Sequence, residues 1–195
     1  MTSILVVCTG NICRSPIAEG LLRDALVARF GAEAPTVASA GTWGVEGSAA
    51  TAEAVTAASE RGTDIAGHRA RRLASVAITD ADLVIAMAGE HRVALTDEHA
   101  AGDRAFTLKE LVRLLESLPP VPPDAGPDAL VGRVSLAAEA RRAGFTGNPF
   151  DEDVADPLGL PLQSYRAIAW ELDEWIGRLV DGLYGAATVP AASEG

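Results

Sequence analysis

The sequence is short of cysteine and of aromatic residues. Only two of its 195 residues are cysteine, and only 5% are aromatic. Two cysteines are too few for the disulfide framework of a secreted domain. Together with three histidines they show no zinc-binding spacing. We therefore expect a reducing, cytoplasmic setting and neither a metal nor another cofactor.

Positive charge is also scarce. Lys and Arg number 16 against 27 Asp and Glu, which gives a formal net charge of −11. Such a charge repels nucleic acid and anionic membrane surfaces. No apolar run approaches the roughly 18 residues of a membrane-spanning helix. We expect no nucleic-acid or membrane partner, although a local cationic pocket remains compatible with this charge.

The remaining composition is that of a globular protein, with 48% apolar and 22% charged residues. A chain of this length can bury a core without disulfide or metal staples. We expect residues 1–184 to form a single domain with a proline-rich insertion near 118–128, and residues 185–195 to form a disordered tail.

Short apolar runs alternate with stretches of helical periodicity. Strands are predicted at Ile4–Val7, Val37–Ala40, Leu83–Met87 and Ala105–Leu108, and helices at 16–30, 50–61, 68–75, 90–99, 109–117, 129–142 and 162–183. Ser15 is a good N-cap for the first helix, with Pro16 as its first residue. The alternation predicts an α/β fold with a parallel sheet.

The loop between the first strand and the first helix has the chemistry of an anion site. Cys8 ends the strand, and the helix that follows offers free N–H groups and a positive dipole end. Gly10 and Asn11 tolerate left-handed backbone conformations, which turn N–H groups inward. Arg14 adds a planar donor fork. The pattern predicts an anion cradle around a thiol, whose positive field favours the reactive thiolate of Cys8.

The stretch from Val7 to Glu19, VCTGNICRSPIAE, resembles the active-site loop of low-molecular-weight protein tyrosine phosphatases. Further similar segments are Ser39–Thr42, His68–Arg71, Asp82–Met87 and Asp156–Pro157. The resemblance covers nearly the whole chain. It implies a four-stranded parallel sheet flanked by helices on both faces, with the phosphate-binding loop between strand 1 and helix 1.

The resemblance also implies a mechanism for hydrolysing phosphotyrosine in a protein substrate. Cys8 would attack phosphorus and form a phosphocysteine, Arg14 would bind the phosphoryl oxygens, and Asp156 would act as the general acid. Ser15 would hydrogen-bond the thiolate. The loop positions implied to bind phosphate are Thr9, Gly10, Asn11, Ile12, Cys13 and Ser15.

Other roles follow from the same resemblance. Ser39 and His68 would support Asn11 in its strained conformation. Ile12, Trp43 and Leu158 would line the substrate cleft. Leu158 departs from the many relatives that carry an aromatic residue directly after the Asp-Pro pair. The family's counterpart of Cys13 can form a reversible disulfide with the nucleophile. A local positive rim could come from Arg69, Arg71 and Arg72.

Several charged residues have plainer interpretations. Asp151, Glu152 and Asp153 are typical of a solvated acidic loop. His91 and His99 are expected on a helix surface rather than as ligands.

Three alternatives to a tyrosine phosphatase stay open. An arsenate reductase of the same fold is disfavoured in its thioredoxin-coupled form, since no resolving cysteine follows Cys13. A protein arginine phosphatase resembles this loop but has threonine in place of Ile12, so Ile12 favours tyrosine. A non-catalytic phosphate-binding module is disfavoured because Cys8, Arg14 and Asp156 are all present.

Overall fold

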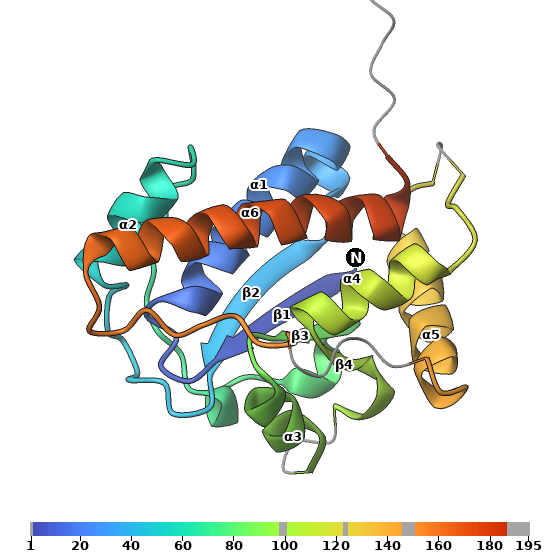
Figure 1. Ribbon diagram of the computed structural model, residues 1–195, viewed down its shortest axis with the longest axis horizontal. Helices are drawn as coiled ribbons and strands as arrows, with labels where there is room; N and C mark the ends of the chain where they lie inside the picture. The colour runs from blue at the N-terminus through green and yellow to red at the C-terminus, as the bar shows by residue number, and fades with distance from the viewer. Residues whose placement is uncertain (1, 98–100, 123–124, 146–150, 187–195) are drawn as a thin grey trace, which may run out of the picture.

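A four-stranded parallel sheet forms the centre of the computed structural model, which describes residues 2–97, 101–122, 125–145 and 151–186 (Figure 1). The strands are β1 (Ser3–Cys8), β2 (Thr36–Gly41), β3 (Leu83–Ala86) and β4 (Ala105–Thr107). They lie in the order β2-β1-β3-β4, and each neighbouring pair is parallel. The chain passes from β1 to β2 on one side and then from β2 to β3 on the other side of β1. The carboxyl end of β1 therefore lies at the switch point where ligands bind in open parallel sheets.

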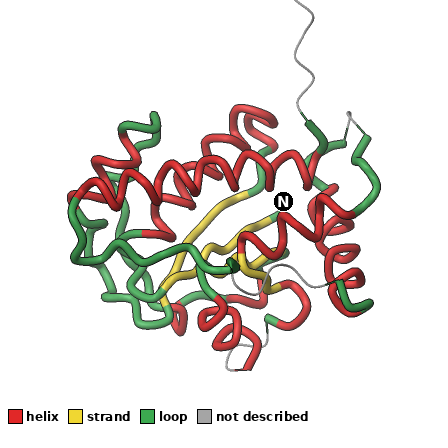
Figure 2. The backbone as a smooth tube through the Cα atoms, viewed as in Figure 1, coloured by secondary structure: helices red, strands yellow, loops and turns green. Residues whose placement is uncertain are grey.

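Helices surround this sheet, as Figure 2 shows in red around yellow strands. They are α1 (Arg14–Phe30), α2 (Ala52–Ser59), α3 (Gly89–Asp97), α4 (Leu108–Ser117), α5 (Ala129–Arg142) and α6 (Leu162–Tyr184). The long α6 packs against α1, α2, α4 and α5. The apolar stripe predicted along α6 is buried in this contact.

The strands are buried on both faces, and successive residues of β1 serve opposite sides. Ile4 and Val6 belong to the core shared with α1, α2, α4, α5 and α6. Leu5 and Val7 belong to a smaller core on the other face, where Leu95 of α3 packs. This arrangement explains why β1 is apolar throughout rather than alternating. It confirms the predicted α/β fold with helices on both faces.

Two local predictions were wrong. Helix α1 begins at Arg14 with Cys13 as its N-cap, rather than with Ser15. The hydroxyl of Ser15 lies 2.9 Å from the sulfur of Cys8 instead of capping the helix.

The predicted helix over 68–75 is also absent from the described residues, apart from a short 3₁₀ turn at Leu73–Ser75. The backbone there makes contacts with the first loop and with the end of β2. The N–H of Arg71 donates to Asn11 Oδ1 at 2.8 Å, and the N–H of Gly41 donates to the carbonyl of Arg71 at 2.9 Å. These contacts use backbone groups that a helix would need for itself.

Of the predicted tail, residues 187–195 lie outside the described part of the chain. Within the described residues, no helix is both long enough and apolar enough to cross a membrane.

Candidate active site

The loop from Cys8 to Arg14 connects β1 directly to α1, as the sequence predicts. Asn11 has a φ of 55°, in the left-handed region that L residues rarely adopt. Gly10 does not share this conformation, so the expectation of a left-handed Gly10 was wrong. Its lack of a side chain matters for space instead, because a Cβ there would lie 3.3 Å from Cγ1 of Ile12.

Cys8 is buried at the bottom of this loop. Its sulfur lies 3.3 Å from the N–H of Asn11 and 2.9 Å from the hydroxyl of Ser15. The sulfur thus accepts one backbone hydrogen bond and shares a second with a hydroxyl that can donate to it.

The side chain of Asn11 holds the loop from below. Its amide nitrogen donates to Ser39 Oγ at 2.7 Å and to Ser15 Oγ at 2.9 Å. Nε2 of His68 lies 2.8 Å from the carbonyl of Asn11. Ser39 in turn donates to Glu19 Oε2 at 2.5 Å. The structure thus brings Ser39 and His68 to Asn11, and it adds Glu19 to the set.

Arg14 opens α1 with its side chain 5% exposed. Its Nη1 donates to the carbonyl of Val154 at 3.1 Å, and its Nη2 donates to Thr9 Oγ1 at 3.3 Å and Asp156 Oδ2 at 2.6 Å. Its Nε is buried and has no hydrogen-bond partner. An unpaired buried donor is costly, and an anion oxygen is the partner that a guanidinium prefers.

Asp156 reaches the loop from the segment that precedes α6. Besides its ion pair with Arg14, its Oδ1 accepts from the N–H of Leu158 at 3.1 Å. Asp156 and Leu158 are both exposed at the mouth of the site. The carboxylate of Asp156 is therefore held against the guanidinium of Arg14 at the edge of the loop.

Asp151, Glu152 and Asp153 lie in a loop, where Asp151 and Asp153 are exposed as the sequence predicts, but each of the three also has a partner. Asp151 pairs with Lys109 and Arg113, Glu152 accepts from Arg113, and Asp153 accepts from the backbone. The sequence did not reveal these ion pairs, because the cationic partners lie about forty positions earlier in the chain.

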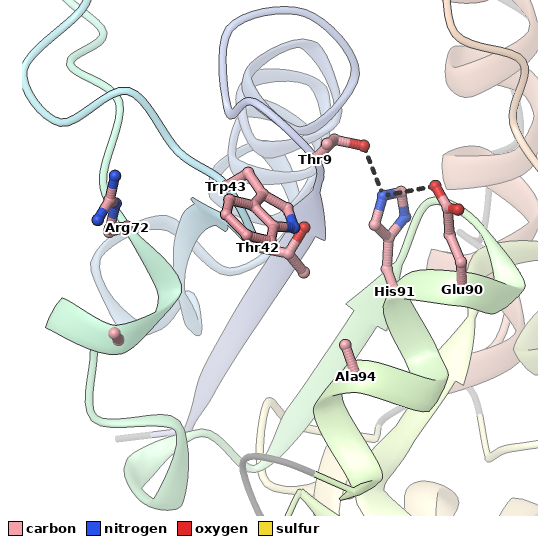
Figure 3. Close-up of a pocket in the computed structure, with 8 residues that line it drawn as sticks. Thr9, Thr42, Trp43, Arg72, Glu90, His91 and Ala94 are labelled. Atoms are coloured by element: carbon pink, nitrogen blue, oxygen red, sulfur yellow. Dashed lines mark hydrogen bonds and ion pairs between the residues drawn. The ribbon is translucent and has the colours of Figure 1, made fainter.

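A pocket of about 470 Å³ lies beside the loop. Its lining residues are Thr9, Thr42, Trp43, Arg72, Ala74, Glu90, His91 and Ala94. Trp43 is 77% exposed, and in Figure 3 its ring lies between Arg72 and the Thr9–His91 pair. Ile12 and Leu158, which were expected in the same cleft as Trp43, do not line this pocket.

His91 is only 2% exposed, so the expectation that it lies on a helix surface was wrong. Nε2 of His91 lies 2.9 Å from Thr9 Oγ1, the same hydroxyl that Arg14 contacts (Figure 3). Burial and the charge of Arg14 lower the pKa of His91, partly opposed by Glu90 and other nearby carboxylates. His99, the other histidine placed on this surface, lies outside the described residues.

Cys13 is a buried free thiol, like Cys8. Its sulfur lies 3.6 Å from the hydroxyl of Tyr165 and 3.7 Å from that of Thr51. Burial raises the pKa of Cys13 despite these hydrogen bonds.

Sequence reasoning missed Gly41 at the end of β2. A Cβ at this position would lie 2.5 Å from the carbonyl oxygen of Thr9 and 3.0 Å from the nitrogen of Asn11. Only glycine permits the strand end to lie this close to the loop. A glycine directly after a predicted strand is a visible signal, but the segment that Gly41 approaches is visible only in the fold. Among the described residues, no group of three or more His, Cys, Asp or Glu side chains could hold a metal ion.

Comparisons with known proteins agree with this geometry. The family model for low molecular weight phosphotyrosine protein phosphatase matches residues 3–117. A protein-arginine-phosphatase of Geobacillus stearothermophilus is 34% identical over 92% of this chain and 95% of its own length. The Escherichia coli K12 low molecular weight protein-tyrosine-phosphatase Etp is 44% identical over 48% of this chain, and the match covers 60% of that relative.

Solved structures show the same likeness over more of the chain. The crystal structure of a low molecular weight protein tyrosine phosphatase from T. tengcongensis has a TM-score of 0.68 at 33% identity and covers 93% of this chain and 99% of that one. The YwlE arginine phosphatase from Geobacillus stearothermophilus has a TM-score of 0.67 at 32% identity, covering 94% of this chain and 93% of that one. With the matched fold and the loop from Cys8 to Ser15 in place, the chain belongs to the low molecular weight phosphotyrosine protein phosphatase family.

Proposed function

We propose that this phosphatase hydrolyses phosphotyrosine in proteins through a phosphocysteine on Cys8. The observation that carries the proposal is the pairing of two features in one loop. The sulfur of Cys8 accepts from the N–H of Asn11 and contacts the hydroxyl of Ser15, and the buried guanidinium of Arg14 has one donor, Nε, without a partner. A nucleophile and an unpaired cationic donor in one anion cradle suit phosphoryl transfer.

In the first step, the thiolate of Cys8 attacks phosphorus in line, and the bond to the tyrosine oxygen breaks. Arg14 binds equatorial oxygens while the charge on them develops. Asp156 donates its proton to the leaving phenolate. The backbone N–H groups of the loop around Asn11, whose own φ is positive, complete the cradle.

In the second step, Asp156 accepts a proton from water, and the water oxygen attacks phosphorus. The S–P bond breaks, and its electron pair returns to the sulfur of Cys8. Ser15, whose hydroxyl lies 2.9 Å from that sulfur, stabilises the departing thiolate. The products are inorganic phosphate and free enzyme.

The decisive assay compares kcat/KM for a phosphotyrosine peptide, a phosphoarginine peptide, an aryl phosphate and arsenate reduction under one set of conditions. We expect the phosphotyrosine peptide to be the best of the peptides. Cys8→Ser should abolish turnover and leave the fold intact, because a hydroxyl without a neighbouring base is a poor nucleophile. Substantial turnover by that variant would remove Cys8 from the mechanism.

Phosphoarginine is the second candidate substrate. It is favoured by the similarity to a protein-arginine-phosphatase over 92% of the chain. Ile12 supports tyrosine, because this residue offers an apolar side chain where the arginine phosphatases have a hydroxyl. A kcat/KM tenfold higher for the phosphoarginine peptide would reverse the preference.

The role of Asp156 has its own test. Asp156→Asn should lower kcat/KM for a phosphotyrosine peptide by roughly 10² to 10⁴-fold. A nitrophenyl phosphate should lose less, because nitrophenolate departs with little help, whereas tyrosine phenolate has a pKa of about 10. Equal losses on both substrates would place the acid elsewhere.

A further inference from the structure

Asp156 ends a segment, residues 151–156, that has no helix or strand of its own. Its position therefore depends on individual contacts. The N–H of Val154 donates to the carbonyl of Met87 at 2.8 Å, and the carbonyl of Val154 accepts from Arg14 at 3.1 Å. These two bonds fix the chain two residues before Asp156, but they leave the beginning of the segment to other contacts.

Side chains of α4 anchor that beginning. Nζ of Lys109 lies 2.8 Å from Asp151 Oδ1, and Nη2 of Arg113 lies 2.8 Å from the other carboxylate oxygen. Arg113 also donates to the carbonyl of Asp151 and, at 3.1 Å, to Glu152. Thr107 Oγ1 donates to Glu152 at 2.6 Å. Two consecutive acidic residues are thus held to the first two turns of one helix.

Lys109 is unusual among these residues because its side chain is only 5% exposed. It is also paired with Glu171 of α6 at 2.7 Å. Burial alone lowers the pKa of Lys109, but the hydrogen bonds to Asp151 and Glu171 outweigh it and raise the pKa above its ordinary value. The bond from Lys109 in turn lowers the pKa of Asp151. The ammonium group therefore remains charged and joins α4, α6 and the acidic segment.

We propose that Lys109 and Asp151 are positioning residues for Asp156. Their ion pair holds the start of the segment against α4, while Val154 holds its middle, so that the carboxyl group of Asp156 has little freedom. General-acid catalysis needs the carboxyl within hydrogen-bond reach of the leaving oxygen, and small displacements weaken it. The inference rests on the proposed role of Asp156 as the acid.

Asp151→Asn is the variant to test. It keeps the shape of a side chain that is 52% exposed, and it leaves the bond from Arg113 to the backbone carbonyl in place. We expect kcat/KM for a phosphotyrosine peptide to fall about 3- to 10-fold, whereas nitrophenyl phosphate should change less than about 2-fold. A substitution that merely destabilised the fold would lower kcat/KM for both substrates by the same factor.

A matched control is Asp173→Asn, which removes an exposed carboxylate from an ion pair with Arg61. It should leave both substrates unchanged. Asp151→Asn should also have no further effect in the Asp156→Asn background, because a residue that acts only through Asp156 loses its influence when the acid is gone.

The outcomes separate the two proposals. If Asp156→Asn shows no dependence on the leaving group, the assignment of the acid is wrong, whatever Asp151 does. The positioning role is overturned if Asp156→Asn depends on the leaving group but Asp151→Asn lowers kcat/KM equally for both substrates, or for neither. Lys109→Met is a second test of the positioning role, and its melting temperature shows whether the variant is folded. A folded Lys109→Met enzyme with an unchanged ratio of the two substrates would also overturn it.

Discussion

Asn11 combines a backbone conformation and a side-chain task that few residues can satisfy together. Its φ of 55° costs most L residues about 1–2 kcal/mol, although asparagine is among the most tolerant. Its amide group contacts Ser15, Ser39 and the N–H of Arg71. Glycine would adopt this conformation at no cost, but it has no side chain with which to hold the loop. Asparagine meets both requirements.

Substitution at Asn11 separates the two tasks. Asn11→Ala should lose both the side-chain bonds and the tolerance of positive φ, whereas Asn11→Gly should lose only the bonds. We expect both variants to lose most activity, with Asn11→Ala less stable than Asn11→Gly by about 1 kcal/mol in chemical denaturation. Greater stability of the alanine variant would show that backbone strain at this position is small.

Gly41 gives a second prediction for a single residue. In Gly41→Ala the new methyl group would meet the carbonyl of Thr9 and the nitrogen of Asn11, so the loop must shift. Because backbone atoms cannot yield as a side chain can, we expect kcat/KM to fall by about 10²-fold or more.

Gly132→Ala in α5 is the matched control for Gly41→Ala. A Cβ at Gly132 meets no atom within 4 Å, and alanine there should stabilise the helix by about 0.5–1 kcal/mol without changing kinetics. Near-normal activity of Gly41→Ala would mean that the loop tolerates displacement.

A substitution at Leu158 tests whether the substrate cleft lacks an aromatic wall. Leu158→Tyr places an aromatic ring two residues from Asp156, where it can stack on an aryl substrate. Such a contact is worth about 0.5–1.5 kcal/mol, or about 2- to 10-fold in KM for aryl phosphates. An unchanged aryl KM would mean that Leu158 does not mark a missing wall of the cleft.

At the scale of elements, the helices and strands with strong periodicity were predictable from the sequence. The segment 129–142 was predicted with the bounds of α5, and β1 was recognisable from its β-branched run. The errors fall where a segment is fixed by distant partners. The backbone of Arg71 bonds to Asn11 and Gly41, and Asp151 is held by Lys109, so the local sequence pattern could not reveal either contact.

Candidate site residues were likewise predictable only where their partners are close in the sequence. Those within the loop, Cys8 to Ser15, were recognisable because neighbours in sequence are neighbours in space. His91 and Glu19 were not, since their partners Thr9 and Ser39 lie on other elements. The sequence shows residue types, whereas burial and partners depend on how β3 and α3 pack beside β1.

Arg133 joins elements at the end of the molecule that holds the proline-rich segment. From α5 it donates to the carbonyls of Gly182, Pro119 and Leu115, at 3.0, 2.8 and 3.1 Å. One buried guanidinium thus ties α5 to the ends of α4 and α6. Burial lowers the pKa of this guanidinium, which offsets part of what its hydrogen bonds contribute.

Arg133→Met should therefore weaken the fold and spare the chemistry. We expect the free energy of unfolding to fall by about 2–4 kcal/mol, because three buried carbonyls lose a charged donor. The kcat of the folded variant should stay within about 2-fold of the original, since none of these contacts involves the site. A large fall in kcat with unchanged stability would contradict this separation.

At the scale of the whole molecule, His91 makes stability depend on pH. Its pKa lies below the ordinary 6.5, so the unfolded chain binds this proton more readily than the folded one. This contribution is complete above pH 6.5 and is lost as the pH falls toward the lowered value. We expect the free energy of unfolding to decline there by at most about 1.4 kcal/mol per pH unit.

Urea denaturation at several pH values between 5 and 8 measures this slope, and His91→Gln provides the comparison. The variant should lose the part of the slope that His91 contributes, because glutamine does not titrate. An identical slope in both proteins would assign the acid sensitivity to other groups.

The bond between Arg14 and Asp156 spans 142 positions of the chain. During synthesis, Cys8 and Arg14 leave the ribosome early, whereas Asp156 and the helix α6 that packs on α1 leave it late. A growing chain therefore carries the proposed nucleophile without its proposed acid, and α1 without the helix that covers it. If Asp156 is the acid, as we propose, a chain still on the ribosome should dephosphorylate the proteins around it far more slowly than the folded protein does.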